Sequence, residues 1–129
     1  MKTIHQRDKF DCGVAAVAML LDGKQRLTRK QAYDLAMEAV GTSKRTRITQ
    51  LKVALAKLSR PLRVGNMAPV PEGELTNLKR DALVLVRFVR NKSKHWMVWD
   101  HRRELLLDPE RAKSQFSEFD LVSQIEVAE

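Results

Sequence analysis

Apolar residues recur at helical intervals in the first half of the chain, and the first such segment begins at or beside Cys12. Asp11 precedes it and is a favourable N-cap residue, while the alanines in the apolar run 14–21 are strong helix formers. Asp22 and Gly23 follow the run and end it. We therefore expect a helix whose first turn contains Cys12, and whose small side chains let other backbone pack closely against it.

Two further helices are predicted before residue 61. The second begins at Thr28, which has the spacing of a capping box with Gln31, and Gly41 stops it. The third runs from about 46 to 59, and Pro61 closes it. Apolar positions at helical spacing in these two segments are Ala32, Leu35, Ala36, Ala39, Val40, Ile48, Leu51, Leu55 and Leu58.

Beyond Pro61 the pattern changes from helices to strands. Strands are predicted at 62–64, 82–89, 95–99, 104–107 and about 123–127, with a loop at 66–73 and a polar turn at 100–103. The segments after residue 80 form an antiparallel meander. We expect an α+β fold, with N-terminal helices packed on a C-terminal antiparallel sheet in one domain over residues 1–129.

The composition fits a folded protein with a basic surface. The 129 residues are 43% hydrophobic and 31% charged, and the formal net charge is +8. Such a surface attracts anions, including nucleic acid or an acidic protein. The basic residues are scattered, however, and one Tyr, two Trp and four Phe give few stacking partners for single-stranded nucleic acid. Nucleic-acid binding is therefore possible but not favoured.

The single cysteine excludes an internal disulfide and favours a cytoplasmic location. The run from Val14 to Leu21 is too short to span a bilayer, and removal of a signal peptide ending there would also remove Cys12. One Cys and three dispersed His have no zinc-ligand spacing, so no metal is expected, and no cofactor either. The oligomeric state is not predicted.

Cys12 and His95 are candidates for nucleophilic catalysis. A thiol reacts as its thiolate, and the positive end of a helix together with a neighbouring imidazolium favours that form. His95 opens the predicted apolar strand, where alternation places it on the face of Met97 and Trp99. The alternatives are a buried structural cysteine and a solvent-facing histidine. His5 and His101 lack such a setting.

Asp108 and Gln6 complete the candidate set. Asp108 ends the strand next to the histidine strand, where a carboxylate can orient the imidazole, although Asp-Pro also initiates turns. Asp100 is a second candidate for that role. Gln6 lies six residues before Cys12 and could donate its side-chain amide to an oxyanion, together with the Cys12 N–H. Alone, Gln6 would be interpreted as a surface residue.

These residues, in this order, resemble the C39 family of bacterial cysteine peptidases. The resemblance rests on Gln6, on Asp11-Cys12-Gly13 with the helix after it, on His95-Trp96-Met97-Val98 and on Leu107-Asp108-Pro109. It implies a papain-like fold, with Cys12 as nucleophile, His95 as base and acid, Asp108 as orienting carboxylate and Gln6 as oxyanion donor. It also implies a peptide or protein substrate, cleaved in this family typically after Gly-Gly or Gly-Ala of a leader peptide.

Many family members are domains of ATP-driven export transporters. This sequence carries neither a transmembrane segment nor a phosphate-binding glycine loop, so we expect a stand-alone domain. Three other functions stay open. The same chemistry serves deamidases and acyl transferases, since water or an amine can resolve the thioester. The chain could also be a non-enzymatic basic module that binds nucleic acid or an acidic partner, or an inactive relative that docks a peptide.

Overall fold

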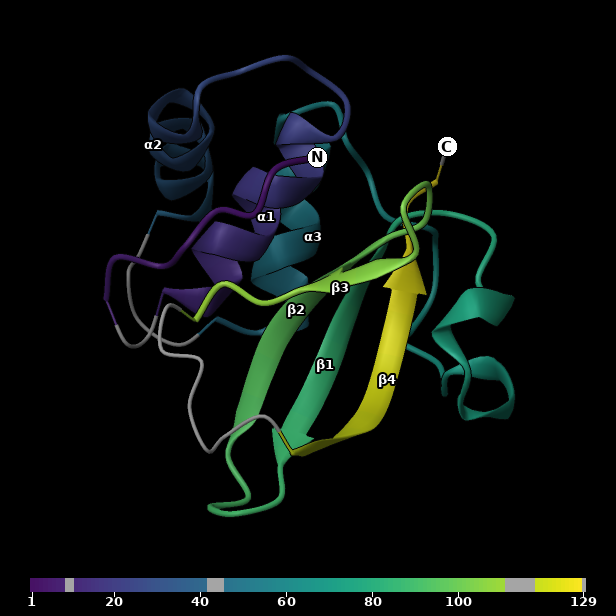
Figure 1. The fold of residues 1–129 in the computed structure, drawn as a ribbon. Coiled ribbons are helices and arrows are strands. Elements are labelled where there is room, and N and C mark those ends of the chain that lie inside the picture. Colours follow the sequence, from purple (N-terminus) through teal and green to yellow (C-terminus); the bar gives the residue numbers. More distant parts are fainter. Residues whose placement is uncertain (9–10, 42–45, 111–117, 129) are drawn as a thin grey trace.

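The computed structural model describes residues 1–8, 11–41, 46–110 and 118–128. Within these ranges three helices pack on a four-stranded antiparallel sheet (Figure 1). The helices are α1 (Cys12–Asp22), α2 (Arg29–Val40) and α3 (Ile48–Lys57), followed by two 3-10 turns, η1 (Pro71–Gly73) and η2 (Leu75–Asn77). The strands are β1 (Ala82–Phe88), β2 (Lys94–Asp100), β3 (Leu105–Leu107) and β4 (Phe119–Glu126). The predicted α+β, papain-like arrangement is confirmed.

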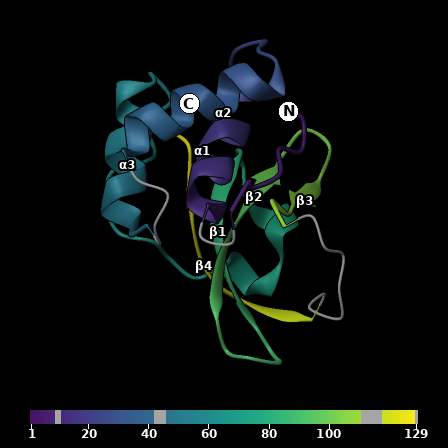
Figure 2. The same cartoon turned by 90° about the vertical axis from the view of Figure 1, so that its left-hand side faces the viewer.

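Helix α1 is the centre of the molecule. It packs against α2, α3, β1 and β2, and Figure 2 shows it between the sheet and the other two helices. Every residue from Gly13 to Asp22 is buried. The small side chains of Ala15, Ala16 and Ala18 allow this close approach from several sides, because large side chains would hold the neighbouring backbone away. The thiol at the start of α1 is therefore attached to the most firmly packed helix of the fold.

The ends of α2 follow the local sequence signals. The Gln31 N–H donates to Thr28 Oγ1 over 3.1 Å, and the Thr28 N–H donates to Gln31 Oε1 over 2.9 Å, which completes the predicted capping box. Gly41 ends the helix in the left-handed region at φ 78°, where glycine is unstrained. The inward face is partly different from the prediction, because Leu35 is 38% exposed and Tyr33 is buried instead.

Four other expectations need correction. Asp11 stands at the N-cap position of α1, but its side chain makes no cap hydrogen bond and instead binds Tyr33. Helix α3 is shorter at each end than the predicted 46–59. The predicted strand 62–64 is reduced to one bridge between Leu62 and Val127, and Val64 is fully exposed. The last strand begins at Phe119, four residues earlier than predicted, because residues 119–121 also pair with β1 beyond a register shift.

The sheet order is β3-β2-β1-β4, so β1, β2 and β3 form the predicted meander and β4 returns to the far side of β1. Strand β3 pairs with β2 only at Val98, Trp99 and Asp100. The first half of β2 is thus without a β3 partner along that edge. This is the half that carries His95, and it lies beside the start of α1.

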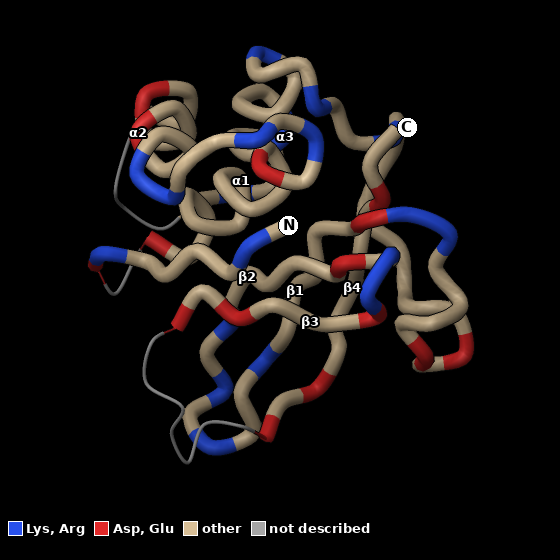
Figure 3. The backbone as a smooth tube through the Cα atoms, turned by 45° about the horizontal axis from the view of Figure 1, so that its top comes forward, with Lys and Arg blue, Asp and Glu red and all other residues tan. Residues whose placement is uncertain are grey.

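Both faces of the sheet are apolar. Leu83, Trp96, Val98 and Ile125 join the core beneath the helices, whereas Val84, Val86, Met97 and Trp99 form a second cluster with Leu78 on the opposite face. Neighbouring residues of a strand point to opposite faces. Figure 3 shows lysines and arginines in many parts of the fold, interspersed with acidic residues. Among the described helices, none has the length and apolarity of a membrane span.

Candidate active site

Cys12 is the first residue of α1 and is partly exposed. The first backbone hydrogen bond of the helix joins the Ala15 N–H to the Asp11 carbonyl over 2.9 Å, so the N–H groups of the first turn before Ala15 have no partner within the helix. They point towards the helix N-terminus and carry its partial positive charge. The predicted position of the thiol at a helix start is therefore observed.

The imidazole of His95 lies between Cys12 and Asp108. His95 is the second residue of β2 and only 6% exposed. Its Nε2 is 2.8 Å from Asp108 Oδ1, which leaves Nδ1 available, and Cys12 lies near enough to raise the pKa of the ring. Phe88, the last residue of β1, packs its ring against the imidazole with centroids 5.2 Å apart. The ring is thus fixed by a carboxylate at one nitrogen and by an aromatic neighbour.

Asp108 follows β3 directly and reaches back to the histidine strand. Its Oδ1 also accepts a hydrogen bond from the Glu110 N–H over 2.8 Å. This second bond fixes the carboxylate towards His95, although the Asp108 side chain is 41% exposed. The alternative orienter, Asp100, lies at the opposite end of β2 and forms an ion pair with Arg103 at 2.7 Å. His5 and His101 are exposed.

The surroundings of His95 favour its charged form. Burial disfavours the imidazolium, but the hydrogen bonds to Asp108 and Cys12 and the charges of both groups outweigh this, and together they raise the pKa of His95 to about 9. A protonated ring at neutral pH stabilises a thiolate beside it.

Gln6 is buried at the start of the same site. Its Nε2 donates to the Asp8 carbonyl oxygen over 2.9 Å, and the Asp11 N–H donates to that same oxygen over 3.1 Å. The amide therefore lies beside the residue that precedes Cys12. An amide nitrogen carries two protons, and Asp8 uses one of them. The Gln6 N–H also donates to the Pro109 carbonyl over 2.8 Å, which joins this segment to the chain just after Asp108.

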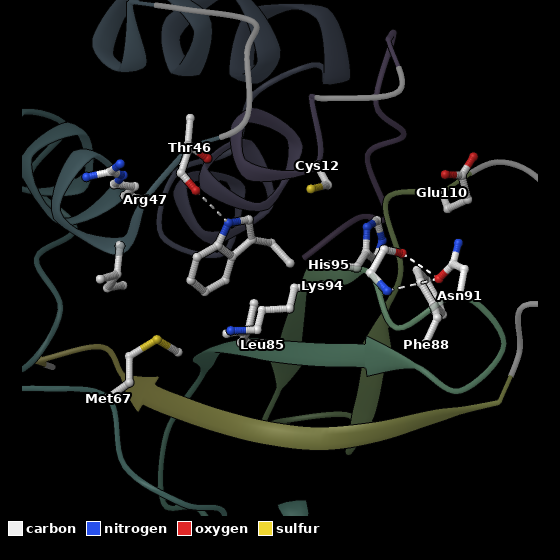
Figure 4. Close-up of a pocket in the computed structure, with 13 residues that line it drawn as sticks. Cys12, Thr46, Arg47, Met67, Leu85, Phe88, Asn91, Lys94, His95 and Glu110 are labelled. Atoms are coloured by element: carbon white, nitrogen blue, oxygen red, sulfur yellow. Dashed lines mark hydrogen bonds between the residues drawn. The ribbon is translucent and has the colours of Figure 1, made fainter.

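A cavity of about 470 Å³ opens beside the thiol (Figure 4). Cys12 and His95 line one end of it. Its apolar lining includes Ile48, Met67, Leu85, Phe88 and Trp96, and its charged lining residues are Arg47, Lys94 and Glu110. Gln6 is not among the described residues that line it. A peptide side chain of moderate size would fit this space, next to the Cys12 thiol.

Thr46 holds the wall of this cavity close to α1. Its carbonyl oxygen accepts a hydrogen bond from Trp96 Nε1 over 3.3 Å, and its Oγ1 would lie 2.0 Å from a Cβ added to Gly13. Thr46 thus contacts the first turn of α1 at a point where only glycine fits. The contacts of Thr46 and Phe88 could not be predicted from the sequence pattern, because each joins distant parts of the chain.

The described residues include no group of three or more His, Cys, Asp or Glu side chains that could hold a metal ion. An activated thiol, an oriented imidazole and nearby amide donors are the parts required for acyl transfer.

Comparison with protein families agrees with the fold. The family model described as "Peptidase C39 family" matches residues 1–124, which is nearly the whole chain. No curated protein matches the sequence. The matched range contains Cys12, His95 and Asp108. With a match over nearly its whole length and the corresponding α+β fold, the chain belongs to the peptidase C39 family.

Proposed function

We propose that the protein is a cysteine peptidase in which Cys12 is the nucleophile, His95 the acid and base, Asp108 the orienting carboxylate and Gln6 an oxyanion donor. The observation that carries this proposal is the position of the His95 ring, which bonds Asp108 Oδ1 at 2.8 Å and lines the same cavity as Cys12. Family membership supports peptide-bond cleavage as the reaction. We also propose that residues 1–129 form a single peptidase domain.

In the first step, the Cys12 thiolate attacks the carbonyl carbon of the scissile bond. The resulting oxyanion would be stabilised by the Cys12 N–H and by the second Nε2 proton of Gln6. His95 then gives its proton to the leaving amine, and an acyl-thioester remains on Cys12. In the second step, His95 removes a proton from water and the hydroxide attacks the thioester, which releases the carboxylic acid and restores the Cys12 thiolate and the His95 imidazolium. Asp108 stabilises the imidazolium each time it forms.

The substrate is a peptide or protein. The family resemblance suggests a leader-like peptide cut after Gly-Gly or Gly-Ala, and the apolar cavity supports an additional side chain in the substrate near the scissile bond. Arg47 and Lys94 at the cavity would favour an acidic neighbour.

The test is cleavage of synthetic peptides that contain an internal Gly-Gly or Gly-Ala pair, with products identified by mass spectrometry. We expect wild-type protein to cut after the pair and Cys12→Ala to be inactive. Cleavage that persists in Cys12→Ala would contradict the proposal. A product whose new terminus carries an added amine instead of a carboxylate would identify an acyl transferase with the same nucleophile, and loss of ammonia without cleavage would identify a deamidase.

A further inference from the structure

The Tyr33 hydroxyl connects two points of the segment between Gln6 and Cys12. Tyr33 is on α2 and only 1% exposed. Its oxygen accepts the Arg7 N–H over 3.2 Å and donates to Asp11 Oδ2 over 2.6 Å. Arg7 directly follows Gln6, and Asp11 directly precedes Cys12. One side chain of another helix thus fixes both residues that adjoin the proposed oxyanion donor and nucleophile.

Tyr33 is itself held in place from the side of α2. The Arg7 guanidinium lies 4.0 Å above the centre of the Tyr33 ring, and it forms an ion pair of 3.2 Å with Asp34, the next residue of α2. Burial, and then the hydrogen bond to Asp11, raise the pKa of Tyr33 far above its usual value. The hydroxyl therefore stays protonated, and it can donate to Asp11 at any physiological pH.

Asp11 depends on this bond. The carboxylate is 2% exposed, and its Oδ1 has no hydrogen-bond partner among the described residues. Burying a carboxylate with only one hydrogen-bond donor costs free energy. At the surface, or as a helix cap, the Asp11 carboxylate would have further hydrogen-bond partners. Its side chain is turned to Tyr33 instead.

We propose that Tyr33 is a positioning residue that sets the distance between the Gln6 amide and Cys12, and so assembles the oxyanion site. This proposal rests on the proposed function. Oxyanion donors act only when they lie within hydrogen-bond distance of the developing charge, so a small displacement of Gln6 relative to Cys12 reduces acylation. Alkylation of the thiol forms no oxyanion and does not need this distance. The ratio of the two rates therefore reports on the oxyanion site.

The experiment measures acylation of Cys12 by p-nitrophenyl acetate and its alkylation by iodoacetamide in the same preparations. We expect Tyr33→Phe to lower the ratio of acylation to alkylation by about 10-fold to 100-fold, with alkylation nearly unchanged. Gln6→Ala should lower the ratio to a similar extent. In a Gln6→Ala background, Tyr33→Phe should have little further effect, because Tyr33 acts through Gln6.

Two Asp11 variants provide a second approach in case Tyr33→Phe does not fold. Asp11→Asn keeps a carbonyl oxygen that can accept from Tyr33, so it should retain most of the ratio. Asp11→Ala removes the acceptor and should reduce the ratio as Tyr33→Phe does. The matched control is Asp22→Ala, which removes a buried carboxylate bonded to Lys2 at the opposite end of α1. It should lower stability and leave the ratio unchanged.

An unchanged ratio in Tyr33→Phe, or losses that simply multiply in the double variant, would overturn the proposal. An unchanged ratio in Gln6→Ala would overturn both the role of Gln6 and this proposal. A different result would contradict the proposed Cys12 and His95 pair. In that case the His95→Ala variant would be alkylated at the same rate as wild type, whatever the ratio of acylation to alkylation.

Discussion

His95 is a buried imidazole with a carboxylate and a thiol as neighbours. The Asp108 carboxylate and the Cys12 thiol stabilise its protonated form more than burial destabilises it. A ring that stays charged at neutral pH can give its proton to a leaving amine, which is the step in which a cysteine peptidase needs an acid. The charge of His95 thus depends on two neighbours from other parts of the chain, one on α1 and one just after β3.

The raised pKa of His95 predicts a pH dependence of stability. Because the folded-state value of about 9 exceeds the ordinary 6.5, the charged ring stabilises the folded protein. This contribution is fully present below about pH 6.5 and is lost as the pH rises through about 9. We expect the difference in unfolding free energy between wild type and His95→Gln to shrink over this range, measured by urea denaturation. A constant difference would contradict the charged pair.

At the scale of single residues, the sequence predicts the positions of the candidate groups better than the contacts that hold them. Cys12 at a helix start, His95 on β2 and Asp108 just after β3 follow from local pattern and hairpin geometry. Asp11 was expected to cap α1, which is also its local preference. The structure turns it to Tyr33, a residue 22 positions away. A sequence pattern cannot choose between a local cap and a distant hydroxyl.

At the scale of elements, the first turn of α1 packs against the segment that leads into α3, and that segment is bonded to β2. Gly13 contacts the Thr46 hydroxyl, and Thr46 is bonded to Trp96 of β2. No side chain can be added at Gly13 unless Thr46 moves, and Thr46 contributes to the cavity wall. The glycine in Asp11-Cys12-Gly13 is therefore explained by packing against the segment that leads into α3.

Gly13→Ala should destabilise the protein by about 1 to 3 kcal/mol, because the new Cβ would lie 2.0 Å from Thr46 Oγ1. Urea denaturation measures this change. The matched control is Gly23→Ala, at the other end of α1. There φ is −62° and the closest atom is the flexible end of Met1, so we expect a neutral effect or a gain of up to about 1 kcal/mol. Equal effects of the two substitutions would contradict the close contact at Gly13.

The ends of elements were predictable where the signals are local. The capping box of Thr28 and Gln31 and the left-handed Gly41 mark the ends of α2 as the sequence indicates. The extent of the strands was less predictable. Residues 62–64 have a strand-like composition, but only Leu62 forms a bridge with another strand residue. Strand β4 begins at Phe119 because β1 continues to Phe88, which pairs with Phe119. Strand length depends on the neighbouring strand as well as on propensity.

At the scale of the whole molecule, Arg60 joins the helical layer to the sheet. Its Nε donates to the Leu20 carbonyl near the end of α1 over 3.1 Å, and its Nη2 forms an ion pair of 2.9 Å with Asp81. Asp81 directly precedes β1 and also accepts the His101 N–H over 2.9 Å. This network lies at the opposite end of α1 from Cys12. It therefore affects stability separately from the site.

Arg60→Ala should lower the unfolding free energy by about 3 kcal/mol, since the ion pair is largely buried and Asp81 would lose its cation. The control is Lys30→Ala, which removes an exposed ion pair with Asp34 and should cost less than about 1 kcal/mol. Both are measured by urea denaturation. A small effect of Arg60→Ala would show that the two layers do not depend on this network. The alkylation rate of Cys12 should not change in either variant.

The central claim is that Cys12 and His95 form an activated pair, and the rate at which iodoacetamide alkylates Cys12 tests it most directly. The single cysteine makes the readout unambiguous. From about pH 4 to about pH 9, we expect wild-type protein to react quickly even on the acidic side, and His95→Ala to react slowly there. Slow alkylation that rises only near the range of an ordinary free thiol, and that is alike in both proteins, would contradict the proposed catalytic pair.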